Sequence, residues 1–231
     1  EADYLISPSE YTKNLIESKY LEKEFFYFCS LNGIFGNSFS DYSEFMKKYF
    51  SRKGKNLKGE KSFLEIGAGQ GIISLLLSEL DIISKIFAVE IQEEVFAALK
   101  KNIEINDLNG KIIPINKNIK NVNGEYDFIF SNPPYKKTSS GKMPENEMER
   151  ISKYEILLTL DELILEIRRL LKNYGEFFVV VPNSRLNDVF RCIYENRLNV
   201  LSVKVNKYKK VDLVVVHGKK GGKVNSGIEI E

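Results

Sequence analysis

The feature that most constrains the fold is a regular alternation of short apolar runs and longer helical patterns. Five apolar runs have the length of strands: SFLEIG, KIFAVE, KIIPI, YDFIF and EFFVVVP. The last of them has the continuous apolar character of a strand that is covered on both faces. Helical spacing lies between or directly after these runs, at residues 70–81, 92–106, 152–172 and 184–197. Strands that alternate with helices predict a doubly wound, mostly parallel sheet.

The chain closes with two more strand patterns, VLSVKVN and VDLVVVH, joined by KYKK. So short a connection predicts an antiparallel hairpin, which brings the sheet to seven strands with the last one antiparallel. Gly175 is the expected stop of the helix at 152–172. Ser184 is the expected N-cap of the helix that follows EFFVVVP.

Two regions are predicted. Residues 1–59 form an N-terminal extension rich in aromatic residues, with helical spacing at 9–29 and 41–50. Residues 60–231 form the α/β domain, and the polar, glycine-punctuated stretch SRKGKNLKGEK joins the two.

Composition excludes several classes of protein. The net charge is only +2, no apolar run approaches the roughly 18 residues of a membrane span, and the first residues do not resemble a secretory leader. Cys29 and Cys192 are far apart, which predicts two buried thiols in a reducing compartment, and with His217 they form no recognisable metal spacing. We expect a cytoplasmic monomer with no metal site and no membrane contact.

A glycine-rich loop, LEIGAGQG, joins the first predicted strand to the first predicted helix. Gly67, Gly69 and Gly71 allow a sharp turn and a close approach of the backbone to a ligand. A dinucleotide loop, G-x-G-x-x-G, would require glycine at position 72, but that residue is Ile. The loop predicts a ligand site without identifying the ligand.

Two carboxylates flank this loop. Glu65 lies two residues before Gly67, and Glu90 ends the second strand, where a carboxylate can accept from both hydroxyls of a ribose. An unpaired Glu65 would be costly to bury, and a positively charged ligand would relieve that cost. S-adenosylmethionine (SAM) carries a sulfonium and an ammonium group, whereas a dinucleotide carries a negative pyrophosphate. The two acids therefore favour SAM.

The stretch IFSNPPY follows the fourth strand. Pro133 and Pro134 lack backbone donors and end the strand, and they bias Asn132 towards an extended conformation. Tyr135 adds an aromatic ring beside them. Ligands bind at the carboxyl ends of strands in α/β sheets, so we expect this segment to face the same site as the glycine loop.

These motifs resemble those of the class I SAM-dependent methyltransferases, over roughly residues 60–217. EIGAGQG is similar to the first motif of that family, Glu90 to its ribose-binding acid, and NPPY to its signature for methylation of amino groups. The resemblance implies a Rossmann-like seven-stranded sheet and SAM as cofactor. Within the family the chain is most similar to bacterial tRNA(Val) adenine-N6 methyltransferases, through ISKYEILLTLDELI and VDLVVVHGKKGGK.

The resemblance also implies roles for individual residues. Asn118 takes the place of an acidic residue that contacts the adenine of SAM, and Ile119 would pack on the adenine face. The implied catalytic residues are Asn132, Pro133, Pro134 and Tyr135. The implied cofactor-binding residues are Glu65, Gly67, Ala68, Gly69, Gly71, Glu90, Ile91, Asn118, Ile119 and Asn132.

An amide suits methylation of an adenine N6 amine, whose lone pair is delocalised into the ring. The Asn132 side-chain oxygen and the Pro133 carbonyl can accept its two hydrogens and so redirect the lone pair. Tyr135 can stack on a flipped base. We expect the substrate to be RNA, most simply tRNA. A glutamine amide of a release factor and a DNA adenine remain alternatives, as does a non-enzymatic SAM-binding module, although the intact NPPY argues against the last.

Basic residues suggest where RNA phosphates would bind. Candidate clusters lie in the linker, directly after NPPY, and near the end of the chain, and the residues 136–151 are a candidate substrate loop. We expect the closing hairpin to return its lysines to the site: Lys207, Lys209, Lys210, Lys219, Lys220 and Lys223.

Overall fold

A computed structural model describes residues 38–53, 57, 59–136, 154–207, 212–222 and 228–230. The helix expected at 9–29, Cys29 and nearly all of the candidate substrate loop lie outside these residues. The elements are α2 (Ser38–Lys53), β1 (Ser62–Ile66), α3 (Ile72–Leu77), β2 (Lys85–Glu90), α4 (Glu93–Ile105), β3 (Ile112–Asn116), η2 (Ile119–Asn121), β4 (Tyr126–Ser131), α6 (Leu160–Leu170), β5 (Leu171–Pro182), η3 (Asn183–Arg185), α7 (Leu186–Glu195), β6 (Leu198–Lys207), β7 (Asp212–Lys220) and β8 (Glu229–Ile230).

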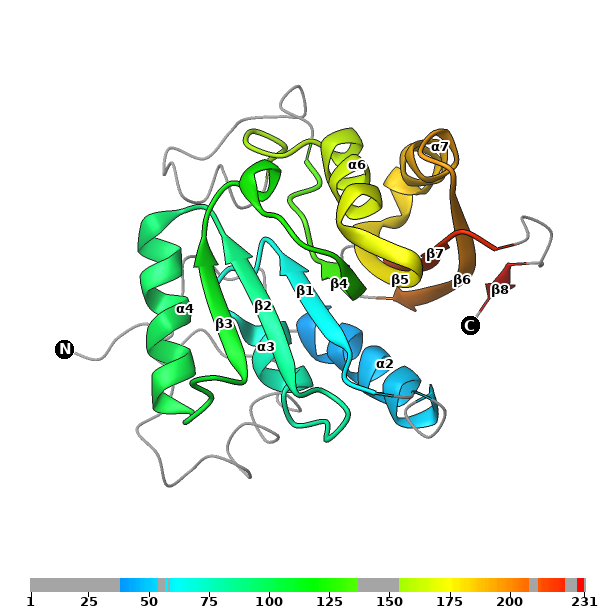
Figure 1. Ribbon diagram of the computed structural model, residues 1–231. Coiled ribbons are helices and arrows are strands. Elements are labelled where there is room, and N and C mark those ends of the chain that lie inside the picture. Colours follow the sequence, from blue (N-terminus) through cyan, green and yellow to red (C-terminus); the bar gives the residue numbers. More distant parts are fainter. Residues whose placement is uncertain are drawn as a thin grey trace.

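The strands form one sheet in the order β3-β2-β1-β4-β5-β7-β6-β8 (Figure 1). Strands β1 to β5 are parallel, and β7 runs antiparallel to both β5 and β6, which confirms the predicted closing hairpin. The expected number of seven strands is wrong, because β8 adds a short parallel strand beside β6. The first half of the sheet follows the doubly wound pattern, in which successive strands step outwards from β1.

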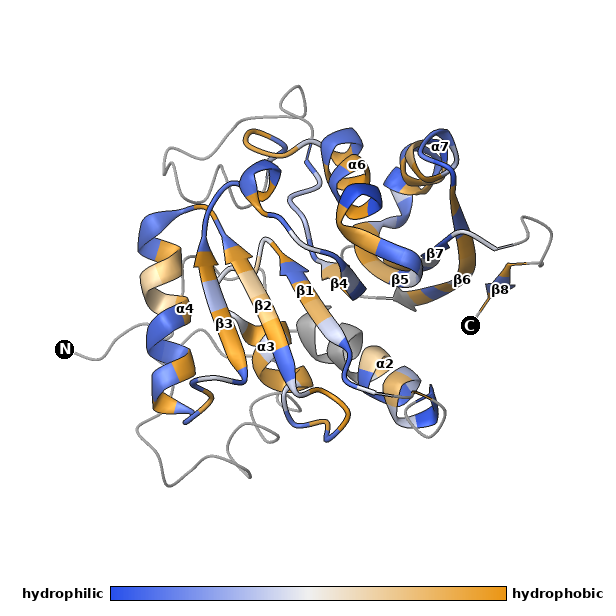
Figure 2. Ribbon diagram, viewed as in Figure 1, coloured by the Kyte–Doolittle hydropathy of each residue, from blue (hydrophilic) through white to orange (hydrophobic). Residues whose placement is uncertain are grey.

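Helices cover both faces of the sheet, and the alternation of side chains along each strand separates the two cores. Leu64, Ile129 and Val179 belong to the cluster beneath α6 and α7. Phe63 and Phe128 point to the opposite face and pack with α2 and α3. Strands β2 and β3 are largely hydrophobic along their length, as expected for strands with a covered face (Figure 2).

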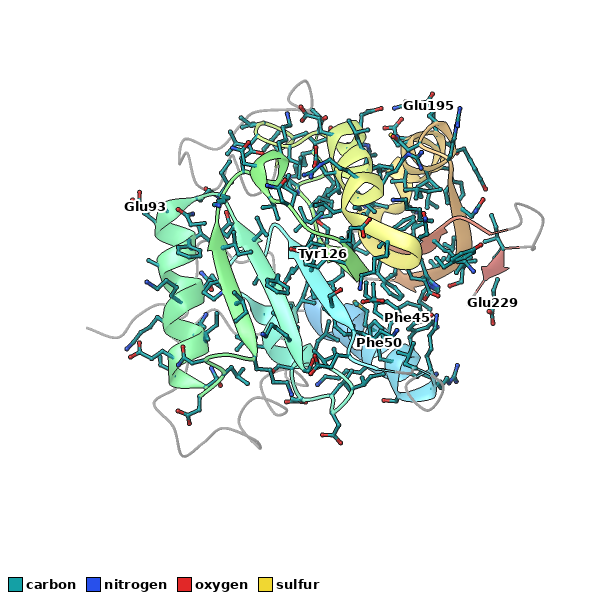
Figure 3. All side chains as sticks on the ribbon, viewed as in Figure 1. Phe45, Phe50, Glu93, Tyr126, Glu195 and Glu229 are labelled. Carbon is teal, nitrogen blue, oxygen red and sulfur yellow. The ribbon has the colours of Figure 1, made fainter. Side chains whose placement is uncertain are left out.

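Helix α2 contains the second helical pattern predicted for the N-terminal extension, and it packs directly on the sheet. Met46 and Phe50 are completely buried, and the Phe50 ring meets Phe128 edge-on at 4.9 Å between centroids. Phe45 and Phe50 lie together on this helix beside the sheet (Figure 3). The boundary after residue 59 stays a prediction, and α2 shares its hydrophobic core with the residues beyond that boundary.

A buried polar network also ties α2 to the sheet. The Glu176 carboxylate accepts hydrogen bonds from Tyr49 and Lys53 of α2, and His217 Nε2 lies 3.2 Å from it. His217 Nδ1 is 3.3 Å from Ser202 Oγ. Burial alone would raise the pKa of Glu176, but the contacts with His217, Lys53 and Tyr49 outweigh it and lower the pKa to about 2.

Helix α6 differs from its prediction at both ends. It begins at Leu160 rather than near residue 152, because Thr159 and Glu162 form a reciprocal capping box. It ends at Leu170, and β5 begins at the next residue. Gly175 therefore does not stop the helix. It lies within β5, where an added Cβ would come within 2.9 Å of the Asp127 carbonyl oxygen.

Helix α7 also starts later than predicted. Ser184 lies in the short turn η3, and the N-cap position of α7 is Arg185, which makes no side-chain cap. Cys192 is a fully buried free thiol, as predicted. No helix within the described ranges is long and apolar enough to cross a membrane. In the same ranges no group of three or more His, Cys, Asp or Glu residues is arranged to hold a metal ion.

Candidate active site

Strand register brings the predicted site residues to one edge of the sheet. Ile66 at the end of β1 pairs with Val89 on one side and Ser131 on the other. Glu90 and Asn132, one residue further along their chains, therefore lie at the carboxyl edge with the glycine loop. Ser131 Oγ donates to the Ile66 carbonyl over 2.8 Å, which ties the ends of β1 and β4 together.

The glycine turn after β1 uses positive φ angles that other residues rarely adopt. Gly67, Gly69 and Gly71 have φ values of 70°, 57° and 86°. A Cβ added at Gly67 or Gly69 would meet nothing within 4 Å, whereas one at Gly71 would lie 2.4 Å from Leu99 Cδ1. The first two glycines thus face open space, and the third permits close packing between α3 and α4.

Glu90 is buried at the end of β2 and braces the glycine turn. One carboxylate oxygen accepts from the Gly69 amide over 2.9 Å, and the other accepts from the Gln92 amide over 2.8 Å. Burial raises its pKa, although these amide contacts oppose the shift. The Ile91 amide also contacts the carboxylate. A carboxylate has about four acceptor positions, so the group can still accept a ligand hydroxyl.

Asn116 supports the same strand end and was not among the predicted site residues. Its Nδ2 donates to the Glu90 carbonyl over 2.9 Å and to the Ile91 carbonyl over 3.3 Å. Ile91 itself is exposed to 39%, which leaves its side chain accessible at this edge. Asn116 could have been found from its position as the last residue of β3, because it lies opposite Glu90 in the sheet.

Glu65 is buried as expected, but the expectation that it lacks a partner is wrong. The backbone amide of Ser74 donates to its carboxyl group over 3.2 Å, and the Ser74 hydroxyl contacts the same oxygen. Burial raises the pKa of Glu65 to about 8, with Glu90 adding to the shift and Ser74 opposing it. Burial thus favours the protonated form of Glu65, and the contacts with Ser74 give its carboxyl group hydrogen-bond partners within the fold. Ser74 stood out in the sequence only as a polar residue within the apolar run IISLLLS.

Asn118 and Ile119 form the turn after β3. Asn118 caps this turn by accepting from the Lys120 amide over 3.0 Å, and Ile119 is only 5% exposed within the cluster beneath α6. Arg169 of α6 holds the turn from the other side, because its Nη2 donates to the carbonyl groups of Ile119 and Val122 over 3.1 and 2.9 Å. A contact of Asn118 and Ile119 with adenine stays a prediction.

The segment Asn132–Tyr135 follows β4 and belongs to neither helix nor strand. Asn132, Pro134 and Tyr135 are half-buried, and Pro133 is buried. The Tyr135 carbonyl accepts a hydrogen bond of 2.6 Å from Nη1 of Arg185, which was not among the predicted site residues. Burial raises the pKa of the Tyr135 phenol.

The lysines near the end of β7 lie elsewhere than predicted. In the strand register, Lys219 of β7 lies opposite Glu176 of β5. Glu176 in turn lies opposite Phe128, near the start of β4. Lys220 Nζ donates to the Leu171 carbonyl at the beginning of β5. Because β7 is antiparallel to β5, its carboxyl end lies at the amino edge of the parallel strands, away from the candidate site. Lys207, by contrast, ends β6, which is also antiparallel to β7, so its backbone lies at the carboxyl edge as expected. Lys209, Lys210 and Lys223 lie outside the described residues.

Comparison with known families identifies the class of protein that carries this site. The family model described as "Methyltransferase small domain" matches residues 26–209. The chain belongs to this family. Its resemblance to methyltransferases is thereby confirmed, and the family's match extends into the N-terminal region that contains α2.

Individual relatives in the methyltransferase family cover less of the chain. One from Dyadobacter fermentans, named "tRNA1(Val) (adenine(37)-N6)-methyltransferase", is 31% identical over 121 residues, which are 52% of this chain and 50% of the relative. A "Release factor glutamine methyltransferase" from Flavobacterium psychrophilum is 37% identical over 84 residues, 35% of this chain and 27% of the relative. The adenine-N6 relatives are thus matched over about half of their length.

Solved methyltransferase structures share the fold. A methyltransferase from Pyrococcus furiosus superposes with a TM-score of 0.64 at 24% identity, over 91% of this chain and 95% of that one. At this level of identity the similarity establishes the fold alone. The sheet is accordingly the Rossmann-like sheet of class I methyltransferases, as predicted.

Proposed function

We propose that the protein is a SAM-dependent N-methyltransferase that modifies the N6 amino group of an adenine in RNA, most simply tRNA. One observation carries this proposal. Asn132-Pro133-Pro134-Tyr135 leaves the carboxyl end of β4 directly beside the glycine turn of β1, so an amide and glycines that face open space share one edge of the sheet.

The residues at this edge fit SAM. The open space at Gly67 and Gly69 can admit a ligand against the backbone, and the Glu90 carboxylate keeps acceptor capacity for a ribose hydroxyl. Asn118 and Ile119 are the proposed neighbours of the adenine, with Ala68 and Ile91 lining the approach. When bound, SAM supplies an electrophilic methyl group carried on a sulfonium. Glu65 contributes by hydrogen bonding to Ser74, which fixes the first turn of α3 behind the glycines.

The chain's own contribution to the reaction lies in the segment after β4. The Asn132 side-chain oxygen and the Pro133 carbonyl oxygen accept the two hydrogens of the acceptor amine and draw its nitrogen towards a tetrahedral shape. Catalysis of this kind depends on orientation and on fixed dipoles rather than on a strong base. Tyr135 offers a half-buried ring on which a flipped base can stack.

The names of the curated adenine-N6 relatives support RNA as the substrate. Two exposed lysines at this edge also suit a polyanion: Lys117 follows β3 and Lys136 follows Tyr135. The stronger sequence identity to a release factor glutamine methyltransferase, over a shorter stretch, keeps a protein glutamine as the second candidate. Both acceptors present an amino group whose lone pair is delocalised.

The decisive experiment offers three acceptors to the purified protein with methyl-labelled SAM: tRNA, release factor and double-stranded DNA. We expect label in tRNA, recovered after nuclease digestion as N6-methyladenosine by mass spectrometry. Label in the release factor and none in nucleic acid would overturn the adenine assignment. As a cellular counterpart, tRNA from cells that lack the gene should have lost one N6-methyladenosine.

A charge-matched pair of variants tests where RNA binds. Replacing Lys117 and Lys136 with Ala should weaken RNA binding and flatten its dependence on salt, by about 0.7–0.9 in log–log slope for each lost phosphate contact. Replacing Lys85 and Lys219 removes the same charge at the opposite edge of the sheet and should leave the slope unchanged. Equal effects of the two pairs would show that RNA does not bind at the carboxyl edge.

A further inference from the structure

Arg185 is a buried cation whose three partners come from three different segments beside the candidate site. Its Nη1 donates to the Tyr135 carbonyl over 2.6 Å and lies 2.6 Å from Glu155 Oε1. Its Nε donates to Asp188 over 2.8 Å. Only 9% of Arg185 is exposed, so these contacts are shielded from water.

Arg185 reaches this position because η3 follows the end of β5, which is the strand next to β4. The end of β5 therefore lies beside the segment that leaves β4. Glu155 strengthens the contact between the segments, since its own amide donates to the Lys136 carbonyl over 2.9 Å. Lys136 and Tyr154 also form an isolated bridge. The two residues after the Asn-Pro-Pro stretch are thus held by Arg185 and by the chain around Glu155.

The stretch between Ser131 and Tyr135 is anchored at both ends. At the near end Ser131 Oγ is bonded to the Ile66 carbonyl, and at the far end Arg185 holds the Tyr135 carbonyl. Between these anchors the rings of Pro133 and Pro134 fix two φ angles. The two anchors and the two fixed φ angles together restrict the path of the backbone that carries Asn132 and the Pro133 carbonyl.

We propose that Arg185 is a positioning residue for methyl transfer, holding the Tyr135 carbonyl so that Asn132 and Pro133 meet the acceptor amine in the productive orientation. It acts through the backbone and does not touch the cofactor. This inference rests on the proposed function, because it assumes that Asn132 and Pro133 receive the acceptor. A planar fork is required: Nη1 meets Tyr135 and Glu155 while Nε meets Asp188, and the single nitrogen of a lysine cannot occupy both places.

The test compares Arg185→Lys with Arg191→Lys, which makes the same change at an exposed arginine of α7 that pairs with Asp161 and Glu195. We expect Arg185→Lys to lower kcat by about 10- to 100-fold, the size of effect that a misplacement of about 1 Å can cause. The KM for the acceptor and the affinity for SAM, measured by calorimetry, should stay within about twofold of wild type. Arg191→Lys should leave all three quantities unchanged.

Two outcomes of this kinetic comparison would overturn the proposal. A folded Arg185→Lys variant with wild-type kcat would show that the contact does not matter, and parallel losses of kcat and SAM affinity would indicate a general structural role. If Arg185→Lys does not fold, Glu155→Gln weakens the same cluster while keeping its shape. That variant should lower kcat with SAM affinity unchanged, and a wild-type kcat would again overturn the proposal.

Hydrogen exchange at the Glu155 amide separates this proposal from the proposed function. Exchange should be faster in Arg185→Lys than in wild type, whichever acceptor is methylated, and unchanged exchange would refute the anchoring. A wild-type protein that methylates release factor instead of tRNA would refute the adenine assignment, and the kinetic comparison would then be made with that acceptor. A wild-type protein inactive on every acceptor would refute the proposed function, and the exchange measurement alone would decide whether Arg185 anchors the segment.

Discussion

Two alanine substitutions in the glycine turn should affect the protein in different ways. Gly69 and Gly71 both have positive φ, but the space around them differs. An added Cβ at Gly69 meets nothing within 4 Å, whereas at Gly71 it would lie 2.4 Å from Cδ1 of the fully buried Leu99. Gly69→Ala should therefore act mainly on ligand binding, and Gly71→Ala mainly on stability.

The magnitudes follow from these contacts. A left-handed conformation costs a residue with a Cβ about 1–2 kcal/mol, which both variants share. Gly71→Ala must also displace Leu99 within a packed core, which costs about 1–3 kcal/mol more. We expect Gly69→Ala to lower the free energy of unfolding by about 1–2 kcal/mol and Gly71→Ala by about 2–5 kcal/mol.

Urea denaturation of both variants gives the stability, and titration calorimetry gives the affinity for SAM. A methyl group projecting into an occupied site should weaken SAM binding to Gly69→Ala by about 10- to 200-fold. Leu99→Ala serves as a control. It should lower the free energy of unfolding less in the Gly71→Ala variant than in wild type, because in that variant it also removes the clash. Wild-type SAM affinity of Gly69→Ala would refute the placement of the cofactor at this turn, and equal stabilities of the two variants would refute the packing role of Gly71.

Three further substitutions test the site. Glu90→Ala should weaken SAM binding, since it removes the acceptor of two hydrogen bonds worth about 1.5–3 kcal/mol each, and calorimetry that shows unchanged affinity would exclude the ribose contact. Asn132→Ala should keep its affinity for SAM and lose methyl transfer, so activity within a few-fold of wild type would count against the acceptor role. Glu65→Gln should remove a dependence of stability on pH. The pKa of Glu65 is about 8 in the folded protein and 4.5 ordinarily, so between these pH values the folded state keeps a proton that the unfolded state loses. The free energy of unfolding of the wild type should therefore fall by about 1.4 kcal/mol for each pH unit between pH 4.5 and 8. Urea denaturation that shows the same slope in the variant would contradict the assignment of this pKa.

The sequence by itself determined the parallel α/β sheet and the edge at which its site lies. The periods of apolar residues differ between strands and helices, and they depend only on local backbone geometry. Glycines after β1, an acid at the end of β2 and prolines after β4 mark the ends of strands. In a parallel sheet such ends meet at one edge, so the sequence alone was enough to group Gly67, Glu90 and Asn132.

Other features depended on partners distant in sequence. Ser74 pairs with Glu65 only because α3 folds back along β1, and Arg185 reaches Tyr135 only because β5 lies next to β4. Local patterns could not reveal either contact. The start of α6 was also set by a specific cap at Thr159 rather than by its apolar period, which continued upstream.

The direction of β7 determines where the basic residues at its end lie in the fold. The hairpin was predicted from its short connection, yet its consequence for Lys219 and Lys220 follows only from the register with β5. An antiparallel strand carries its last residues to the edge where the parallel strands begin, so these lysines lie away from the site. The sequence determined which residues gather at the end of each strand, because that information is local. Only the tertiary structure decided which of those ends and side chains meet, because their contacts depend on the order and direction of strands far apart in the chain.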